Sequence, residues 1–384
     1  MRPNTPVYLD NQATTQCDPR VVQAMLPWFT ENFANPHSAE HAMGRAAEAA
    51  VEQARAEIAT LIGAEPREIV LTSGATESNN IAIKGAARHA RRVDDRRKRV
   101  ITLVTEHKCV VESVADLAED GFDPVFLPVR RDGTLDPERL ADALSTPTLL
   151  VSVMLVNNDT GVIQDITAIA AQVKAAGALL HCDAAQACGK IPVDVAGIDL
   201  LSISAHKLYG PKGVGALYVR RRPRARVAAL FSGGNQERGL RSGTLATPLI
   251  VGFGEACRLA RLEMADDTAR ITELRDNLLA SLLRDIPGLQ LNGSPTQRIA
   301  GNLNLTFPNR TAAELMADSP DLCVSTGSAC SSAAVEPSYV LRAMGLSDAE
   351  ASRSLRIGIG RFTSAADTQF AARAFAVSHA LQQA

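Results

Sequence analysis

The sequence predicts an α/β fold: a large domain with a mostly parallel sheet covered by helices on both faces, followed by a smaller α+β domain. Strand-like apolar runs alternate with helical patterns through the first part of the 384 residues. Such alternation is typical of right-handed crossovers, which place helices on both faces of a parallel sheet. After about residue 250 the pattern changes, and short strands are interleaved with helices in another order.

The elements of the large domain are predicted in chain order from their periodicity and their caps. An extended segment at residues 7–15 comes first, and Asp18-Pro19 then starts a short helix, because proline is favoured in a first turn. Ser38 is predicted to cap an alanine-rich helix that ends near Gly63. The predicted strands lie at residues 68–71, 100–104, 124–129, 149–154, 178–181, 200–203 and 214–219. The predicted helices between them lie at residues 76–88, 110–119, 137–144 and 166–176.

The second domain begins where the alternation ends. A long helical segment at 250–284 leads into strand-like runs at 289–291, 303–307 and 355–359. We therefore expect a large domain at 15–249 and a small domain made of 1–14 and 250–384.

Composition and charge narrow the class of protein. The net charge is −2 and aromatic residues are 4% of the chain, which argues against nucleic acid as a partner. The basic runs at 88–99 and 220–226 are interpreted as solvated surface. We expect no signal peptide and no membrane segment. The seven cysteines include no C-x-x-C pair, so we expect a reduced, cytoplasmic protein.

Lys207 lies directly after a predicted buried strand and before a glycine-rich stretch at 210–215, with Ser204 and His206 beside it. The glycines allow backbone or ligand to come close. A lysine amine held neutral forms Schiff bases with carbonyl compounds. Taken alone, Lys207 could equally cap a turn.

Residues 73–80, S-G-A-T-E-S-N-N, place the start of a helix directly after a strand. Free backbone N–H groups and the helix dipole suit a phosphate there, and Thr76 can add its hydroxyl. An ordinary turn with a capping threonine is the alternative.

Polar side chains also follow two further strands of the predicted sheet. His107 could face a ligand or cap a helix, and Asp183 could pair with a protonated ring nitrogen or cap a helix. Gln186 could reach a phenolic oxygen with its amide. Ligands of such sheets bind at the carboxyl ends of the strands, where these side chains converge.

Three stretches later in the chain contain the remaining candidate site residues. The polar loop 235–244 could hold anions through its arginines and Thr244, or be plain surface. The small residues around Cys330 predict a mobile loop with an accessible thiol, which could also be incidental. No metal site is predicted there. Arg356 lies within a predicted strand, where it could bind a substrate carboxylate or form a salt bridge.

Together these candidates are the parts of a site for pyridoxal phosphate: a Schiff-base lysine, an aspartate for the ring nitrogen, a histidine for the ring, a phosphate cup and an arginine for the substrate carboxylate. The chain also resembles a known family over nearly its whole length. It resembles the cysteine desulfurases of the NifS/IscS type, which are fold-type I, class V aminotransferase-like enzymes dependent on pyridoxal phosphate. The resemblance is carried by Y-L-D-N-Q-A-T-T, N-P-H-S-A-E-H, S-G-A-T-E-S-N-N, T-E-H-K, V-N-N-D-T-G-V-I-Q-D, H-C-D-A-A-Q, S-A-H-K-L-Y-G-P-K-G-V-G, R-S-G-T, S-T-G-S-A-C-S-S and L-R-I-G-I-G-R-F-T.

The resemblance implies a role for each matching residue. Lys207 would carry the cofactor and His107 would stack on the ring and handle protons. The remaining cofactor contacts implied by the resemblance are Ala75, Thr76, Asn158, Asp183, Gln186, Ser204 and His206. Arg356, with Asn35, would bind the substrate carboxylate, and Thr244 would reach the site of the neighbouring subunit in a homodimer.

The resemblance further implies removal of sulfur from L-cysteine, which gives L-alanine and a persulfide on Cys330. The sulfur would pass to an acceptor or an iron–sulfur scaffold protein for cluster assembly, and Cys330 would transiently contact a nascent cluster, with no resident metal. Selenocysteine lyase and a same-fold aminotransferase are the alternatives within the fold. A non-enzymatic sulfur carrier and a nucleic-acid-binding protein are alternatives of other classes.

Overall fold

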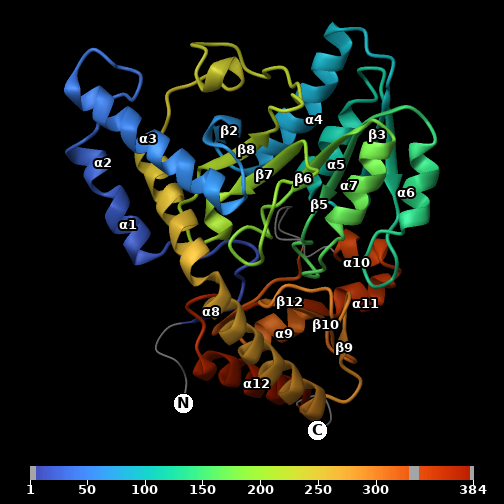
Figure 1. Ribbon diagram of the computed structural model, residues 1–384. Coiled ribbons are helices and arrows are strands. Elements are labelled where there is room, and N and C mark those ends of the chain that lie inside the picture. Colours follow the sequence, from blue (N-terminus) through green and yellow to red (C-terminus); the bar gives the residue numbers. More distant parts are fainter. Residues whose placement is uncertain (1–5, 328–336, 381–384) are drawn as a thin grey trace.

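A seven-stranded sheet forms the centre of the larger part of the molecule in the computed structural model, which describes residues 6–327 and 337–380 (Figure 1). Its strands, in sheet order, are β2 (Ile69–Thr72), β8 (Gly215–Val219), β7 (Leu200–Ser204), β6 (Leu179–Asp183), β5 (Thr148–Met154), β3 (Arg99–Leu103) and β4 (Asp123–Leu127). β8 is antiparallel to both neighbours and the other pairs are parallel. The predicted, mostly parallel sheet is therefore confirmed.

Alternate residues of each central strand pack on opposite faces of the sheet. Val151 and Val153 belong to one core cluster, while Leu150 belongs to another. The first cluster also receives side chains from α3 (Ala42–Leu61), α7 (Ile166–Ala175) and the start of α8 (Thr247–Asp285), and the second from α4 (Ala75–Arg92) and α5 (Lys108–Asp116). Burial on both faces explains why the strands read as continuous apolar runs.

The remaining helices of this part are α1 (Pro19–Met25), α2 (Pro27–Thr30) and α6 (Pro137–Leu144), and Val21 of α1 and Leu140 of α6 belong to the first core cluster. The predicted Ser38 cap is wrong. His41 is the N-cap of α3, and its ring Nδ1 accepts from the Gly44 amide at 3.0 Å. Ser38 instead closes the preceding turn through its own amide, which donates to the carbonyl of Asn35.

The smaller part contains an antiparallel sheet of β9 (Gln290–Leu291), β10 (Asn302–Thr306) and β12 (Ser354–Gly358), with β10 in the middle. β1 (Val7–Tyr8) pairs in parallel with β11 (Leu322–Cys323), so segments from the two ends of the chain meet here. The other described elements of this part are α9 (Ala312–Asp318), α10 (Tyr339–Ala343), α11 (Asp348–Ser352) and α12 (Ala365–Ala380).

Helix α8 connects the two parts of the molecule, as Figure 1 shows. Phe253 near its start is buried in the core of the large sheet, while Leu278 near its end is buried with Phe375 of α12. One continuous helix of 39 residues therefore contributes to both cores. The domain boundaries at 14/15 and 249/250 stay a prediction. None of the described helices has a stretch long and apolar enough to cross a membrane.

Candidate functional site

A cavity of about 720 Å³ lies at the carboxyl ends of the parallel strands. β2 is antiparallel to β8, which is antiparallel to β7, so β2 also ends at this edge. The small part contributes Arg356 of β12 and Tyr339 of α10 to the wall. The residues predicted from the sequence that line the cavity are Ala75, Thr76, His107, Asn158, Asp183, Gln186, Ser204, His206, Lys207 and Arg356.

Lys207 is held at the end of a short 3₁₀ turn that follows β7 directly. Its Nζ donates to the main-chain carbonyls of Gln12 and Ala13, both at 2.6 Å. Gly215 at the start of β8 must be glycine, since a Cβ there would lie 2.6 Å from the Cα of Gly74. The turn after β2 is thereby packed against the start of β8, which pairs with β7, the strand that precedes Lys207.

Asp183 ends β6 and its carboxylate is buried and hydrogen-bonded. Oδ2 accepts from Asn79 Nδ2 at 2.8 Å, and Oδ1 accepts from the Ala185 amide at 2.9 Å. Asn79 comes from α4, so packing of this helix on the sheet sets the orientation of the carboxylate. A carboxylate fixed in this way can hold a proton on a ring nitrogen.

His107 caps helix α5 and also lines the cavity. Its Nδ1 accepts from the Cys109 amide at 3.2 Å, so Nε2 carries the hydrogen of the neutral ring. Burial lowers the pKa of His107, while the nearby Asp183 opposes that shift. The imidazole is therefore neutral near pH 7, which suits stacking on a ring and a hydrogen-bond donor at Nε2.

The N-terminus of α4 provides an anion site beside Lys207. Its N-cap, Gly74, contributes no side chain, so the amides of the first turn have no side-chain cap. The hydroxyls of Thr76 and Ser204 lie at the same cavity wall. His206 completes this wall, and burial together with the charge of Lys207 lowers its pKa to about 4. These groups fit a phosphate bound mainly by dipoles and hydroxyls.

Arg356 points into the cavity from β12 with its side chain buried. Nη2 contacts Asp10 Oδ1 at 2.8 Å and Nη1 donates to the Asn158 carbonyl at 3.0 Å. Within the described chain, Arg356 Nε and Asn158 Oδ1 are buried without a hydrogen-bond partner. Buried polar atoms without partners are uncommon, so the wall fits a polar ligand that would satisfy them.

The fit to pyridoxal phosphate rests on this set of groups. A lysine, a fixed aspartate, a neutral histidine and an uncapped helix N-terminus line one cavity. Gln186 adds an amide whose Nε2 donates to the Gln12 carbonyl at 2.8 Å. The residues present therefore match the ring, phosphate and carbonyl of the cofactor, and the arginine remains for a substrate carboxylate.

Two predicted residues, Asn35 and Thr244, do not line this cavity in the described chain. Asn35 is exposed in a turn, where its side chain accepts from the His37 amide at 3.0 Å. Thr244 is exposed after the loop 235–243. Cys330 lies outside the described residues. Gly327 and Pro337, the described residues on either side of 328–336, both line the cavity. The roles of all three remain predictions.

Sequence reasoning missed several residues of the wall. Asn79 lies within the S-G-A-T-E-S-N-N motif, and a helical position one turn after Thr76 was the signal available. Gln12 acts through its carbonyl, which no side-chain pattern reveals. Glu106, a polar residue that follows a predicted strand beside His107, does not line the cavity; it is fully buried next to Met154, and burial raises the pKa of its carboxyl well above the usual range.

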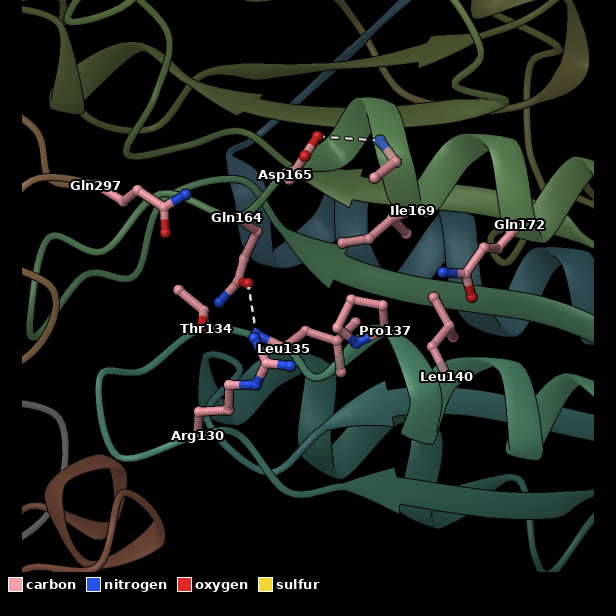
Figure 2. Close-up of a pocket in the computed structure, with 11 residues that line it drawn as sticks. Arg130, Thr134, Leu135, Pro137, Leu140, Gln164, Asp165, Ile169, Gln172 and Gln297 are labelled. Atoms are coloured by element: carbon pink, nitrogen blue, oxygen red, sulfur yellow. Dashed lines mark hydrogen bonds between the residues drawn. The ribbon is translucent and has the colours of Figure 1, made fainter.

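A second cavity, of about 190 Å³, lies between α6 and α7 (Figure 2). Its lining includes Arg130, Asp165 and Gln164, none of which the sequence predicts as a site residue. Gln164 is engaged in holding the chain, because its Oε1 accepts from the Leu135 amide at 2.9 Å and its Nε2 donates to the Gly133 carbonyl at 2.8 Å. The larger cavity is therefore the candidate active site.

Comparison with known proteins agrees with this assignment. The family model described as "Aminotransferase class-V" matches residues 7–370. A protein named mitochondrial cysteine desulfurase from Arthroderma benhamiae is 53% identical, with 97% of this chain and 74% of the relative covered. Cysteine desulfurase IscS of Rickettsia bellii is 50% identical, with 96% and 90% covered. A solved structure titled NifS-like protein superposes with a TM-score of 0.90 at 33% identity, covering 98% of this chain and 100% of that one.

Proposed function

Because the chain belongs to the aminotransferase class-V family, we propose that it is a cysteine desulfurase that uses pyridoxal 5'-phosphate to move sulfur from L-cysteine to Cys330. One observation carries the proposal: Lys207, Asp183 and His107 line a single cavity whose wall also contains both described neighbours of the segment 328–336, Gly327 and Pro337. The segment that includes Cys330 is thus joined to the chain at the cavity wall on both sides.

Lys207, Asp183 and His107 would hold the cofactor or move protons beside it. When bound, pyridoxal phosphate supplies an electron sink for the electrons released at the Cα of the amino acid. Lys207 would hold the cofactor through its amine, and this amine would also be the base for the Cα proton of the amino acid. Asp183, oriented by Asn79, keeps a proton on the ring nitrogen. The amine of Lys207 can return the proton taken from Cα, and His107 assists as a hydrogen-bond donor at Nε2.

Arg356 binds the substrate carboxylate. Its Nε is buried without a partner in the described chain, and Asp10 and the Asn158 carbonyl fix the rest of the guanidinium. A fixed guanidinium binds a carboxylate with two parallel hydrogen bonds. Asn35 is proposed to assist, although it is exposed and apart from the cavity lining in the described chain.

Cys330 takes the sulfur by nucleophilic attack. Its thiolate attacks the sulfur of the substrate, so that a sulfur–sulfur bond forms while the carbon–sulfur bond breaks. The electron pair of the broken bond remains with the β-carbon, which then takes up a proton, and the product is alanine. The sulfur atom is oxidised to the persulfide level while the carbon is reduced, so no external oxidant is required.

The assembly and the destination of the sulfur are further parts of the proposal. Thr244 is exposed, which suits a contact across a homodimer with the phosphate wall of the partner's cavity. An acceptor or iron–sulfur scaffold protein receives the persulfide sulfur, with Cys330 in transient contact with a nascent cluster. The cytoplasm stays the predicted compartment.

The proposal is tested by incubating the purified holoenzyme with L-cysteine and a thiol reductant and measuring alanine and sulfide together. We expect equal amounts of the two products, and sulfide formation that is lost in Cys330→Ser although this variant keeps its bound cofactor. Equal sulfide release by wild type and Cys330→Ser would contradict the persulfide step. Turnover that requires an added 2-oxo acid would indicate the aminotransferase alternative, and turnover of selenocysteine but not cysteine would indicate the lyase.

A further inference from the structure

Lys190 lies behind the cavity wall, four residues after Gln186 in the chain. Its Nζ donates to Gln186 Oε1 at 2.7 Å, and Gln186 Nε2 donates to the Gln12 carbonyl at 2.8 Å. The same carbonyl accepts from Lys207 at 2.6 Å. Lys190 is thereby connected to the cofactor lysine through one amide and one carbonyl.

The two hydrogen bonds of Gln186 together decide which way its amide faces. An ammonium can only donate, so the group next to Lys190 must be the amide oxygen. A carbonyl can only accept, so the group next to Gln12 must be the amide nitrogen. One hydrogen of Nε2 then remains for the cavity, which Gln186 lines.

We propose that Lys190 is a positioning residue that fixes the Gln186 amide, so that its NH₂ group faces the cavity and donates to the ring oxygen of bound pyridoxal phosphate. The proposal rests on the proposed function, because it requires the ring beside Lys207. It goes beyond that function in giving a task to a lysine that does not line the cavity.

The electrostatic setting of Lys190 is consistent with a role inside the site rather than in a surface ion pair. The residue is partly exposed as a whole, but its amine end is buried. Burial and the like charges of Lys207 and Arg356 lower its pKa to about 7, while Cys188 opposes that shift. His206 also faces this charge, which contributes to its own lowered pKa.

No carboxylate pairs with Lys190 in the parts of the chain that the structure describes. A neutral lysine amine still carries hydrogens and can donate to Oε1. The amide orientation is therefore maintained on both sides of that pKa.

The test measures the absorbance of the bound cofactor against pH in wild type, Lys190→Met and Gln186→Ala. A hydrogen-bond donor at the ring oxygen favours the deprotonated form of the ring system, so losing the Gln186 donor, or the contact that orients it, raises the apparent pKa of the absorbance transition. We expect Lys190→Met to raise it by about one unit. Lys190→Arg should restore the wild-type value, and Lys174→Met, at an exposed position on α7, should not change it.

The double variant decides whether Lys190 acts through Gln186. In the Gln186→Ala background, Lys190→Met should cause no further shift, because the group that it positions is already absent. An unchanged transition in Lys190→Met, or a shift of the same size in both backgrounds, would overturn the proposal. If Lys190→Met does not fold, Lys190→Leu, which also removes the amine donor, carries the same expectation.

A borohydride experiment on wild type separates this inference from the proposed function. If borohydride fixes no cofactor to Lys207, the proposed function fails and the inference fails with it. If cofactor is fixed to Lys207 but the Lys190 variants behave as wild type, the inference alone is overturned.

Discussion

Gly327 packs directly on the buried carboxylate of Asp159: a Cβ at this glycine would lie 1.7 Å from Oδ1. The hydroxyl of Ser338 donates to the other carboxylate oxygen. One buried acid thus contacts the chain on both sides of residues 328–336, which include Cys330. Burial raises the pKa of this carboxyl, and the charge of Arg356 opposes that shift.

We predict that Gly327→Ala slows alanine formation from L-cysteine by about tenfold, which corresponds to ~1.4 kcal/mol. The added methyl group collides with Asp159 and displaces one end of the segment that includes Cys330. The absorbance of the bound cofactor should remain, because Lys207 and Asp183 are unaffected. The rate of alanine release, measured beside the absorbance spectrum, checks both expectations.

Gly121→Ala is the matched control for this prediction. Gly121 has a φ of +80°, close to the +85° of Gly327, but no atom lies within 4 Å of the point where a Cβ would stand. Its replacement adds backbone strain of roughly 1 kcal/mol and leaves the cavity untouched. Equal rates for the two alanine variants would show that the contact with Asp159 has no catalytic consequence.

We predict that Glu237→Ala lowers the free energy of unfolding by roughly 3 kcal/mol, because it leaves the buried guanidinium of Arg55 without its main partner. Arg55 Nη1 and Nη2 contact the two carboxylate oxygens at 2.7 and 2.8 Å, and the Leu71 amide donates to the same carboxylate at 2.7 Å. Urea unfolding followed by circular dichroism measures the change. Asp285→Ala, which removes the exposed pair Arg284–Asp285, should have no measurable effect.

We predict that stability falls as the pH is lowered from about 6.5 to about 4, in part because of His181. Burial lowers the pKa of His181 from 6.5 to about 4, and its ring lies between the hydroxyls of Ser152 and Ser202. Between about pH 6.5 and pH 4, His181 therefore binds a proton in the unfolded state but not in the folded state. The stability contributed by the neutral ring is fully present above 6.5 and is lost towards 4, by about 3 kcal/mol.

The variant His181→Asn should remove about one proton from the slope of unfolding free energy against pH over this range. His37→Asn, at an exposed position, is the control and should leave the slope unchanged. A slope that is the same in His181→Asn and wild type would assign the acid sensitivity to other groups.

We predict that Arg356→Lys raises the KM for L-cysteine by about tenfold or more while the cofactor stays bound. A lysine cannot make two parallel hydrogen bonds to a carboxylate, and it would lose one of the two contacts to Asp10 and the Asn158 carbonyl. Steady-state kinetics with L-cysteine give KM, and absorbance gives the bound cofactor. Loss of cofactor with an unchanged KM would place Arg356 in the cofactor site instead.

Much of the site could be predicted because it is built at strand ends. Asp183 and Lys207 follow buried apolar runs, and parallel strands bring such positions to one edge of a sheet whatever their separation in the chain. His107 and Thr76 also follow predicted strands, and their position at the cavity could be predicted in the same way. Local pattern was sufficient because each of these side chains is positioned by its own strand and the turn after it.

Other contacts could not be predicted because they depend on the tertiary packing of distant segments. Gln12 serves the site with a carbonyl, and its neighbours Lys207 and Gln186 lie 195 and 174 positions away. The role inferred for Lys190 depends on the contact between its amine and Gln186 Oε1, which no sequence pattern predicts. The capping error at Ser38 arose because several polar residues precede α3, and only the turn geometry selects His41.

The most direct test of the central claim is a single turnover of the holoenzyme with a stoichiometric amount of L-cysteine and no reductant, followed by intact-mass and peptide mass spectrometry. We predict one alanine released per active site and the mass of one added sulfur atom on the peptide that contains Cys330. Alanine released with no sulfur on Cys330, or sulfur retained by the Cys330→Ser variant, would contradict the account.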